Sequence, residues 1–420
     1  MQIALNIPPK LKGRITLPAS KSVSNRALLL QALCPEKRYA IANLAVCDDT
    51  DHMLQGVVAK QAKASLIDVG ATGTAMRFLT AYLAISEGEA IITGSERMQQ
   101  RPIGTLVEAL RKLGADITYV NKEGYPPLCI KGRRLQGGEL EIEAGISSQY
   151  ISALLMIAPC LMDGLTLHLK GNIASRTYIE LTLGLMRKYG AMSEWTDEQT
   201  IRVAPGAYED VPLTVEADWS AASYWYELAA IATHHGHEVE IILPGLMPDS
   251  QQGDRVVAQL FEPLGVRTEY IEEGARLRHS ECNNQNSGLA ELDFTHCPDI
   301  AQTLAVTHCL LGIPYIYKGI HSLRIKETDR VAALIAELRK LGFVLRAEGD
   351  ECLIWDGTRC APDPQPTIAT YDDHRMAMAF APAALCYDGL TIEHPEVVTK
   401  SYPSFWEHLR QWTNGIDSGK

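Results

Sequence analysis

The sequence lacks two features that would point to membranes or nucleic acid. No uninterrupted apolar run approaches the ~20 residues that a membrane-spanning helix needs, and the run ISALLMIAPCLM ends at Asp163. Positive charge is not in excess either, because 39 Lys and Arg face 51 Asp and Glu, for a formal net charge of −12. An acidic chain has little non-specific affinity for nucleic acid or anionic lipid. Any anion-binding site must therefore be a local basic pocket.

Signatures of metals, nucleotides and export are missing as well. Ten cysteines occur without a C-x-x-C pair, and MQIALNIPPK has no apolar stretch like that of a signal peptide. The segment GATGTAMR (70–77) lacks the Walker lysine and the G-x-G-x-x-G spacing of nucleotide loops. The histidines of THHGH (233–237) have no Cys or carboxylate partner at ligand spacing. We expect a cytoplasmic protein without a bound metal.

What the sequence does have is internal repetition. Four stretches, beginning near residues 110, 185, 260 and 338, share a helix end, a Gly, a strand, a polar turn and a second strand. Their spacing is about 75 residues. Upstream of each lies a strand, a polar turn, a helix, a second strand, a second polar turn and a second helix. We interpret the chain as six βαβαββ-like units, abbreviated at the end of the first and last, in two domains of three units.

The polar turns recur at equivalent places in the repeat. The first turns are 20–26, 70–77, 145–150, 216–223, 297–303 and 371–377, and the second turns are 47–52, 96–104, 174–178, 248–254, 324–330 and 397–403. Each turn is expected at a helix N-terminus, where free N–H groups and the helix dipole favour anions.

Unusual polar residues concentrate in these turns. The cations are Lys21, Arg26, Arg101, Lys326, Arg330, Arg375 and Lys400; the neutral donors are Ser147, Ser148, Gln149, Ser175 and Tyr178; groups able to transfer protons are Asp299, Glu327, Asp373 and His374. Each one alone is also compatible with a solvated side chain or a helix cap. Their coincidence at equivalent turns favours a site for ligands with several phosphate or carboxylate charges.

Seven segments together resemble one family. In chain order between about residues 10 and 406 they are SKSVSNRALLL, GTAMRFL, RMQQRPIGTLVEALRKLGA, SSQYISALLM, PDIAQTLA, RIKETDR and DDHRMAMAF. They resemble the EPSP synthases (3-phosphoshikimate 1-carboxyvinyltransferases). The resemblance implies a two-domain inside-out α/β barrel, three βαβαββ units per domain, with helices buried and sheets outside. It implies one domain of residues 1–17 and 219–420, another of 18–218, crossings near 16–20 and 216–220, and an active site between them.

The reaction implied by the resemblance joins phosphoenolpyruvate to the 5-hydroxyl of shikimate 3-phosphate and releases phosphate. It proceeds by addition and elimination without a metal or organic cofactor, in the biosynthesis of chorismate and aromatic amino acids. By similarity Asp299 is the base, Lys326 and Glu327 are the other candidates for proton transfer, Lys21 touches both ligands, and His374 is a weaker candidate for the acid. The expected partners are these two small molecules alone, bound by a monomer with no nucleic acid or membrane partner.

The resemblance also assigns the ligand contacts. Shikimate 3-phosphate is expected to contact Lys21, Ser22, Arg26, Ser147, Ser148, Gln149, Ser175, Tyr178, Asp299, Ser322 and Lys326. Phosphoenolpyruvate is expected to contact Lys21, Gly73, Arg101, Gln149, Arg330, Arg375 and Lys400.

The chain departs from the family pattern in three places. The usual Asn-Ala-Gly-Thr loop reads Ala71-Thr72-Gly73-Thr74, and the proline after the following arginine is Phe78. This loop lies at the family's glyphosate site, so the resemblance does not extend to inhibitor sensitivity. Ser-Lys-Pro-Tyr becomes Ser175-Arg176-Thr177-Tyr178, which keeps the serine and tyrosine, and Asp-Ser-Ser becomes Asp218-Trp219-Ser220.

Two alternatives to this function are less compatible with the residues present. UDP-N-acetylglucosamine enolpyruvyl transferase would carry a reactive cysteine near RMQQRPIG, but no Cys stands between Cys47 and Cys129. A non-catalytic anion-binding relative would have lost Asp299, Lys326 or Glu327, and all three are present. Both alternatives are disfavoured.

Overall fold

The computed structural model describes residues 1, 10–145, 147–280 and 289–412. The chain divides into two compact units: unit 1 is Met1–Pro18 with Glu216–Lys420, and unit 2 is Ala19–Val215. The expected N-terminal segment 1–17 includes residues 2–9, which lie outside the described residues, as does Ile146 of the turn 145–150.

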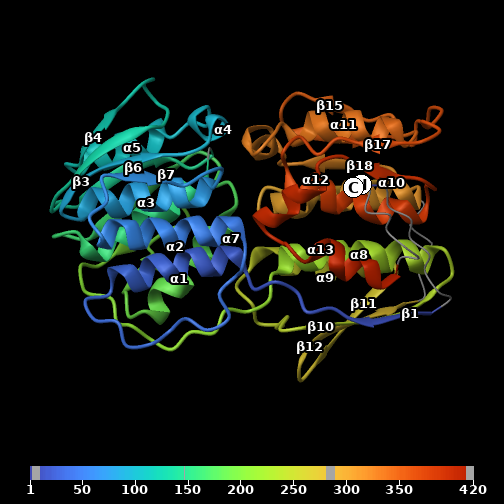
Figure 1. The fold of residues 1–420 in the computed structure, drawn as a ribbon, viewed down its shortest axis with the longest axis horizontal. Helices are drawn as coiled ribbons and strands as arrows, with labels where there is room; N and C mark the ends of the chain where they lie inside the picture. Colours follow the sequence, from blue (N-terminus) through green and yellow to red (C-terminus); the bar gives the residue numbers. More distant parts are fainter. Residues whose placement is uncertain (2–9, 146, 281–288, 413–420) are drawn as a thin grey trace. The chain divides into compact units, whose positions relative to one another are not determined.

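Unit 2 alternates helices and strands along its length (Figure 1). Its elements in chain order are α1 (Lys21–Leu33), α2 (Asp48–Gln61), β2 (Leu66–Asp68), α3 (Gly73–Ile85), β3 (Gly88–Thr93), α4 (Glu96–Gln99), α5 (Gly104–Lys112), β4 (Asp116–Tyr119), β5 (Leu128–Gly132), β6 (Gly138–Glu143), α6 (Ser148–Ile157), η1 (Ala158–Cys160), β7 (Leu165–Lys170), α7 (Arg176–Lys188), β8 (Ser193–Trp195) and β9 (Thr200–Val203).

Unit 1 repeats the same alternation. Its elements are β1 (Lys10–Arg14), α8 (Trp219–His234), β10 (Glu238–Pro244), η2 (Gly253–Val256), α9 (Val257–Phe261), β11 (Val266–Ile271), β12 (Gly274–His279), β13 (Ala290–Asp293), η3 (Pro298–Ile300), α10 (Ala301–Leu311), β14 (Tyr315–Lys318), η4 (His321–Ile325), α11 (Arg330–Lys340), β15 (Arg346–Glu348), β16 (Cys352–Trp355), β17 (Thr367–Ile368), α12 (His374–Phe380), η5 (Ala381–Leu385), β18 (Thr391–Ile392), η6 (Pro395–Lys400), α13 (Phe405–Leu409) and η7 (Arg410–Trp412).

Four sheets share one topology, which confirms the predicted βαβαββ repeat. Their strand orders are β2-β3-β5-β4, β6-β7-β9-β8, β1-β10-β12-β11 and β13-β14-β16-β15. In each, the first two strands pair in parallel and the remaining pairs are antiparallel. Among the described residues, the two abbreviated units contribute the parallel pair β17-β18 and a parallel bridge between Ala42 and Thr214.

Each unit pairs two strand positions that lie far apart in the sequence. In unit 1, β1 pairs in parallel with β10, with Leu11 opposite Val239. In unit 2, Thr214 bridges Ala42, although it lies just before the chain enters α8. The chain therefore leaves unit 1 after one strand and returns to it after the last strand position of unit 2.

The helices that follow the first polar turns form the interior of each unit. In unit 2, α1, α3 and α6 contact one another, and in unit 1 so do α8, α10 and α12. In unit 1, α8 packs between strands β10 and β12 on one side and helix α10 on the other (Figure 1). Strands such as β7 and β10 instead alternate buried residues with more exposed ones, as in sheets that cover a core with one face. This arrangement confirms the predicted fold class of buried helices and outer sheets.

The first polar turns open helices in all six units, as predicted. Four of these starts have a side-chain cap, in which an oxygen accepts a backbone N–H: Ser20 from Val23, Ser147 from Gln149, Asp218 from Ala221 and Asp373 from Arg375. Within the described part of the chain, no helix is both long and apolar enough to span a bilayer.

Gly132 provides a test of the close packing between a sheet and a buried helix. A Cβ atom at Gly132 would lie 1.7 Å from the carbonyl oxygen of Ser86 and 2.4 Å from that of Leu83. Because backbone cannot yield as a side chain can, we expect Gly132→Ala to lower the free energy of unfolding by about 2–3 kcal/mol. Gly206→Ala is the control, since its Cβ would meet nothing within 4 Å. Equal melting temperatures for the two variants would contradict this packing.

Candidate functional site

Arg330, the first residue of α11, is the centre of an ion network in unit 1. Its side chain is almost completely buried, yet it contacts three carboxylates. Nε lies 2.7 Å from Oδ2 of Asp373, Nη1 lies 3.1 Å from Oδ1 of Asp299, and Nη2 lies 3.0 Å from Oε2 of Glu327. Burial alone lowers the pKa of Arg330, but the three carboxylates reverse this and raise the pKa above its usual value.

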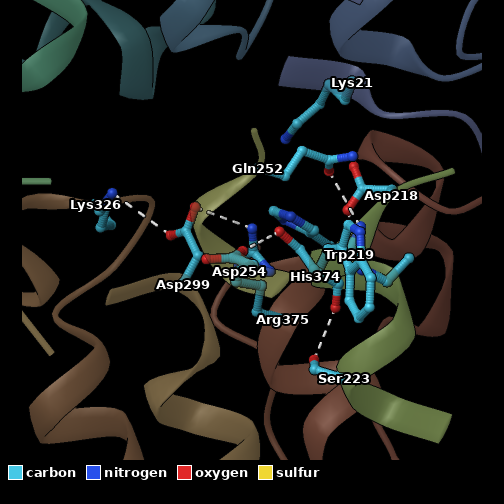
Figure 2. A network of polar contacts seen from close by, with 12 residues as sticks. Lys21, Asp218, Trp219, Ser223, Gln252, Asp254, Asp299, Lys326, His374 and Arg375 are labelled. Atoms are coloured by element: carbon cyan, nitrogen blue, oxygen red, sulfur yellow. Dashed lines mark hydrogen bonds and ion pairs between the residues drawn. The ribbon is translucent and has the colours of Figure 1, made fainter. Parts of the chain in front are cut away.

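Asp299, in η3, contacts three cations, of which Figure 2 shows Lys326 and Arg375. Besides Arg330, its Oδ1 is 3.5 Å from Nζ of Lys326 and its Oδ2 is 3.1 Å from Nη2 of Arg375. Arg375 also donates to the hydroxyl of Tyr224, at 3.4 Å. Three cations thus contact one carboxyl group, and a carboxylate is one of the side chains that can act as a general base.

The remaining predicted residues of unit 1 join or flank this network. Oε1 of Glu327 lies 3.3 Å from Nζ of Lys400, at the end of η6. Nδ1 of His374 lies 3.5 Å from Oδ1 of Asp373, and the imidazole is buried. Ser322 lies in η4, just before Lys326. The structure thus brings together Asp299, Lys326, Glu327, Arg330, His374, Arg375 and Lys400, which are separated by up to a hundred residues of chain.

Asp254 is a buried carboxyl group of unit 1 that the sequence analysis did not single out. It lies in η2 and accepts a hydrogen bond from the hydroxyl of Ser220. Burial, together with the charge of nearby Asp299, raises its pKa from 3.8 to about 6, against the opposing effect of Arg375. The only available signal was its place in the second polar turn 248–254.

Arg26 is the most buried predicted cation of unit 2. Its guanidinium donates only to uncharged oxygens: Oγ1 of Thr182 at 2.7 Å, the carbonyl of Ser22 at 3.0 Å, Oγ of Ser152 at 3.2 Å and the carbonyl of Tyr178 at 3.4 Å. None of the described carboxylates forms an ion pair with it. Burial lowers the pKa of Arg26 to about 10, so the side chain stays charged at neutral pH. A buried cation that is satisfied only by dipoles is a favourable place for an anion.

Lys21 and the start of α3 complete the polar groups of unit 2. Nζ of Lys21 lies 2.8 Å from Oδ2 of Asp49, a residue of α2. Nη1 of Arg101 lies so close to Gly73 that an added Cβ there would be 2.8 Å away. Gln149 donates to Oγ1 of Thr74 at 3.2 Å.

The other predicted residues of unit 2 lie at the starts of α6 and α7. Ser147 caps α6 and Ser148 is its first residue. Ser175 stands before α7 with φ +54°, and the ring of Tyr178 faces the guanidinium of Arg26 at 5.7 Å. Arg77 of unit 2 was missed by the sequence analysis; it donates to the carbonyls of Gly73 and Pro102, at 3.2 and 3.0 Å. Only its place in the turn 70–77 could have indicated it.

Comparison with known proteins decides the family. The family model for EPSP synthase (3-phosphoshikimate 1-carboxyvinyltransferase) matches residues 5–63 and 56–409. The chain belongs to the EPSP synthase family. A Bacteroides fragilis protein named 3-phosphoshikimate 1-carboxyvinyltransferase is 50% identical over 420 residues and 100% of both chains. A protein of that name from Photobacterium profundum is 38% identical over 427 residues and 96% of both chains.

Solved structures of two other proteins share the fold. An EPSP synthase from Acinetobacter baumannii superposes with a TM-score of 0.74 at 20% identity, covering 100% of both chains. The enolpyruvyl transferase NikO from Streptomyces tendae gives a TM-score of 0.70 at 14% identity, covering 98% of this chain and 97% of that one.

Among the described residues, no group of three or more His, Cys, Asp or Glu side chains is placed to hold a metal ion.

The raised pKa of Asp254 predicts a pH dependence of stability. Because the folded state binds this proton more tightly than the unfolded chain does, the contribution of Asp254 to the unfolding free energy falls as pH rises from about 4 through 6. Asp254→Asn removes the titration, so we expect its stability relative to the parent protein to rise by about 2 kcal/mol between pH 4 and pH 7. Denaturant unfolding at a series of pH values measures this difference.

The control for Asp254→Asn is Asp249→Asn, which neutralises an exposed carboxyl group in the same turn. Parallel stability profiles for the parent protein and Asp254→Asn would show that Asp254 does not titrate in this range.

Proposed function

We infer that this chain transfers the enolpyruvyl group of phosphoenolpyruvate to the 5-hydroxyl of shikimate 3-phosphate, releasing phosphate by addition and elimination. The reaction belongs to the shikimate pathway, towards chorismate and the aromatic amino acids. Full-length relatives at 50% identity that carry the name 3-phosphoshikimate 1-carboxyvinyltransferase support it.

The observation that carries the binding part of the proposal is the environment of Arg26. A guanidinium that is 3% exposed and held only by neutral oxygens lacks a counter-charge among the described residues. An anionic group of shikimate 3-phosphate would supply that charge, and the one guanidinium N–H left over from the four hydrogen bonds, on Nη1, can donate to it. We propose that Arg26 binds shikimate 3-phosphate, together with Lys21, Ser22, Ser147, Ser148, Gln149, Ser175, Tyr178, Asp299, Ser322 and Lys326.

Phosphoenolpyruvate is proposed to bind a second group of cations. These are Lys21, Arg101, Arg330, Arg375 and Lys400, with Gly73 and Gln149. The start of α3 supports this assignment, because Arg101 lies against Gly73 at a helix N-terminus, where free N–H groups favour an anion. In unit 1, the ligand oxygens would share guanidinium donors that Asp299 and Glu327 also contact.

The proton transfers are proposed to involve side chains of the ion network around Arg330. Asp299 is proposed to take the proton of the attacking hydroxyl, and its contacts with three cations hold its carboxyl group in place. Lys326 and Glu327 are the proposed partners in adding the methylene proton and removing it, and the buried His374 is a further candidate for the acid. Neither a metal nor an organic cofactor has a part in this mechanism.

We also propose that the active site lies between two domains. One domain comprises residues 1–17 and 219–420, and the other comprises residues 18–218. Supporting this, the proposed ligand contacts are divided between unit 1 and unit 2. Closure of the two domains on the substrates would exclude water from the intermediate. We propose that the enzyme acts as a cytoplasmic monomer, in keeping with its acidic composition.

The activity itself is the first test of this function. Purified protein with shikimate 3-phosphate and phosphoenolpyruvate, in buffer with a metal chelator, is expected to release phosphate and form the enolpyruvyl product in equal amounts. Phosphate release without the enolpyruvyl product, or neither, would reject the proposed reaction.

The role of Asp299 is tested by Asp299→Ala. We expect kcat to fall by about 10²–10⁴, while both substrates still bind with dissociation constants within a few-fold of the parent values, because the cations remain. Glu291→Ala is the control, since Glu291 pairs with Lys318 on the exposed face of the same unit. Unchanged kcat in Asp299→Ala would remove this residue from the role of base.

A further inference from the structure

The turn that leads into α12 has an unfavourable backbone. Tyr371 and Asp372 are consecutive non-glycine residues with φ values of +54° and +55°. The turn is closed by a hydrogen bond from the N–H of Asp373 to the carbonyl of Thr370, at 2.9 Å. Turns with two positive φ angles favour Asn, Asp and Gly, and a bulky side chain such as tyrosine is strongly disfavoured there. Contacts elsewhere must therefore hold this turn in place.

Those contacts come from the end of helix α11. Glu337 is only 1% exposed, and its Oε1 accepts a hydrogen bond from the hydroxyl of Tyr371 at 2.7 Å. Its Oε2 accepts one from the N–H of Ala369 at 3.0 Å and lies 2.7 Å from Nζ of Lys340. Lys340 also donates to the carbonyl of Thr367, at 2.8 Å. One buried carboxylate and its lysine thus hold the segment 367–371 at three points.

The other end of the same helix holds the residue that follows the turn. Arg330 and Glu337 are seven residues apart, about two helical turns, so they lie on the same face of α11. Arg330 binds Asp373 through Nε and Nη2, at 2.7 and 3.3 Å. Asp373 in turn accepts the N–H of Arg375 at 2.9 Å and so caps α12. The turn at Tyr371 is therefore fixed on both sides by α11.

We propose that Glu337 is a positioning residue, which holds the Tyr371–Asp372 turn in its unfavourable conformation and thereby sets where Arg375 lies beside Arg330. The inference rests on the proposed role of these two arginines in binding phosphoenolpyruvate. Without the hydroxyl contact, Tyr371 relaxes toward negative φ, and the start of α12 moves with it. Burial and the carboxylate of Glu337 raise the pKa of Tyr371 to about 12, so its hydroxyl remains a donor throughout the working pH range.

The first experiment compares Tyr371→Phe with Tyr387→Phe. Tyr387 donates its hydroxyl to the carbonyl of Leu341 at 2.6 Å, so the control removes an equivalent hydrogen bond near the end of α11 without touching the turn. We expect Tyr371→Phe to raise the KM for phosphoenolpyruvate about tenfold, as expected for a misplaced binding group. The KM for shikimate 3-phosphate should change less than about twofold, because most of its proposed contacts lie in unit 2. Tyr387→Phe should leave both constants unchanged.

A second pair of variants separates positioning from general damage. Tyr371→Asn also loses the hydroxyl, but asparagine tolerates positive φ. Its KM for phosphoenolpyruvate is expected to lie much closer to the parent value than that of Tyr371→Phe does, although asparagine differs more from tyrosine than phenylalanine does. Glu337→Gln keeps one acceptor oxygen, so its KM for phosphoenolpyruvate should lie between those of the parent protein and Tyr371→Phe. Its kcat should change less than this KM.

The outcomes are distinguishable. If Arg375→Ala does not raise the KM for phosphoenolpyruvate, both the proposed contact and the positioning role of Glu337 are rejected. If Arg375→Ala raises it but Tyr371→Phe behaves like Tyr387→Phe, the assignment of Arg375 stands and the positioning role is rejected. If Tyr371→Asn is as impaired as Tyr371→Phe, or both substrates' KM values rise equally, the unfavourable turn is not what Glu337 maintains.

Discussion

The buried guanidinium of Arg330 has to be neutralised, because an unpaired charge inside a protein is destabilising by several kcal/mol. Three carboxylates from three different segments meet this demand: Asp299, Glu327 and Asp373. The same carboxylates contact Lys326, Arg375 and Lys400. Neutralising one cation therefore assembles the whole polar cluster of unit 1, and stability and chemistry depend on the same contacts.

The two units solve the problem of buried positive charge differently. In unit 1 every buried guanidinium of the cluster contacts a carboxylate, so an incoming anion has to share donors with existing partners. In unit 2 Arg26 is held by hydroxyl and carbonyl oxygens, which solvate the charge without neutralising it. The first arrangement suits a site where protons and negative charge are redistributed during reaction, and the second suits steady binding of a phosphate.

The repeat could be predicted from sequence because the residues that mark the ends of its helices and strands act locally. Gly residues after helix ends and capping residues such as Ser20, Ser147 and Asp373 mark element starts without reference to the rest of the fold. The polar turns likewise indicated most of the cluster around Arg330. Asp254 escaped notice because its importance comes from burial beside Asp299, some 45 residues away in sequence, which no local pattern reveals. The backbone of Tyr371 was equally hidden, since tyrosine does not indicate positive φ.

The division of unit 1 into two separate stretches of chain has a consequence for the order in which the protein can form during synthesis. Strand β1 is made first, but Glu238, the partner of Lys10 in β10, lies 228 residues further along the chain. Unit 2 is one continuous insertion, Ala19–Val215, and can leave the ribosome before that partner emerges. The segments leading into and out of it are joined by a hydrogen bond from the N–H of Asp218 to the carbonyl of Pro18, at 2.9 Å. A folded insertion thus replaces a long flexible loop, and the entropy lost when β1 finally pairs is smaller than its separation in sequence suggests.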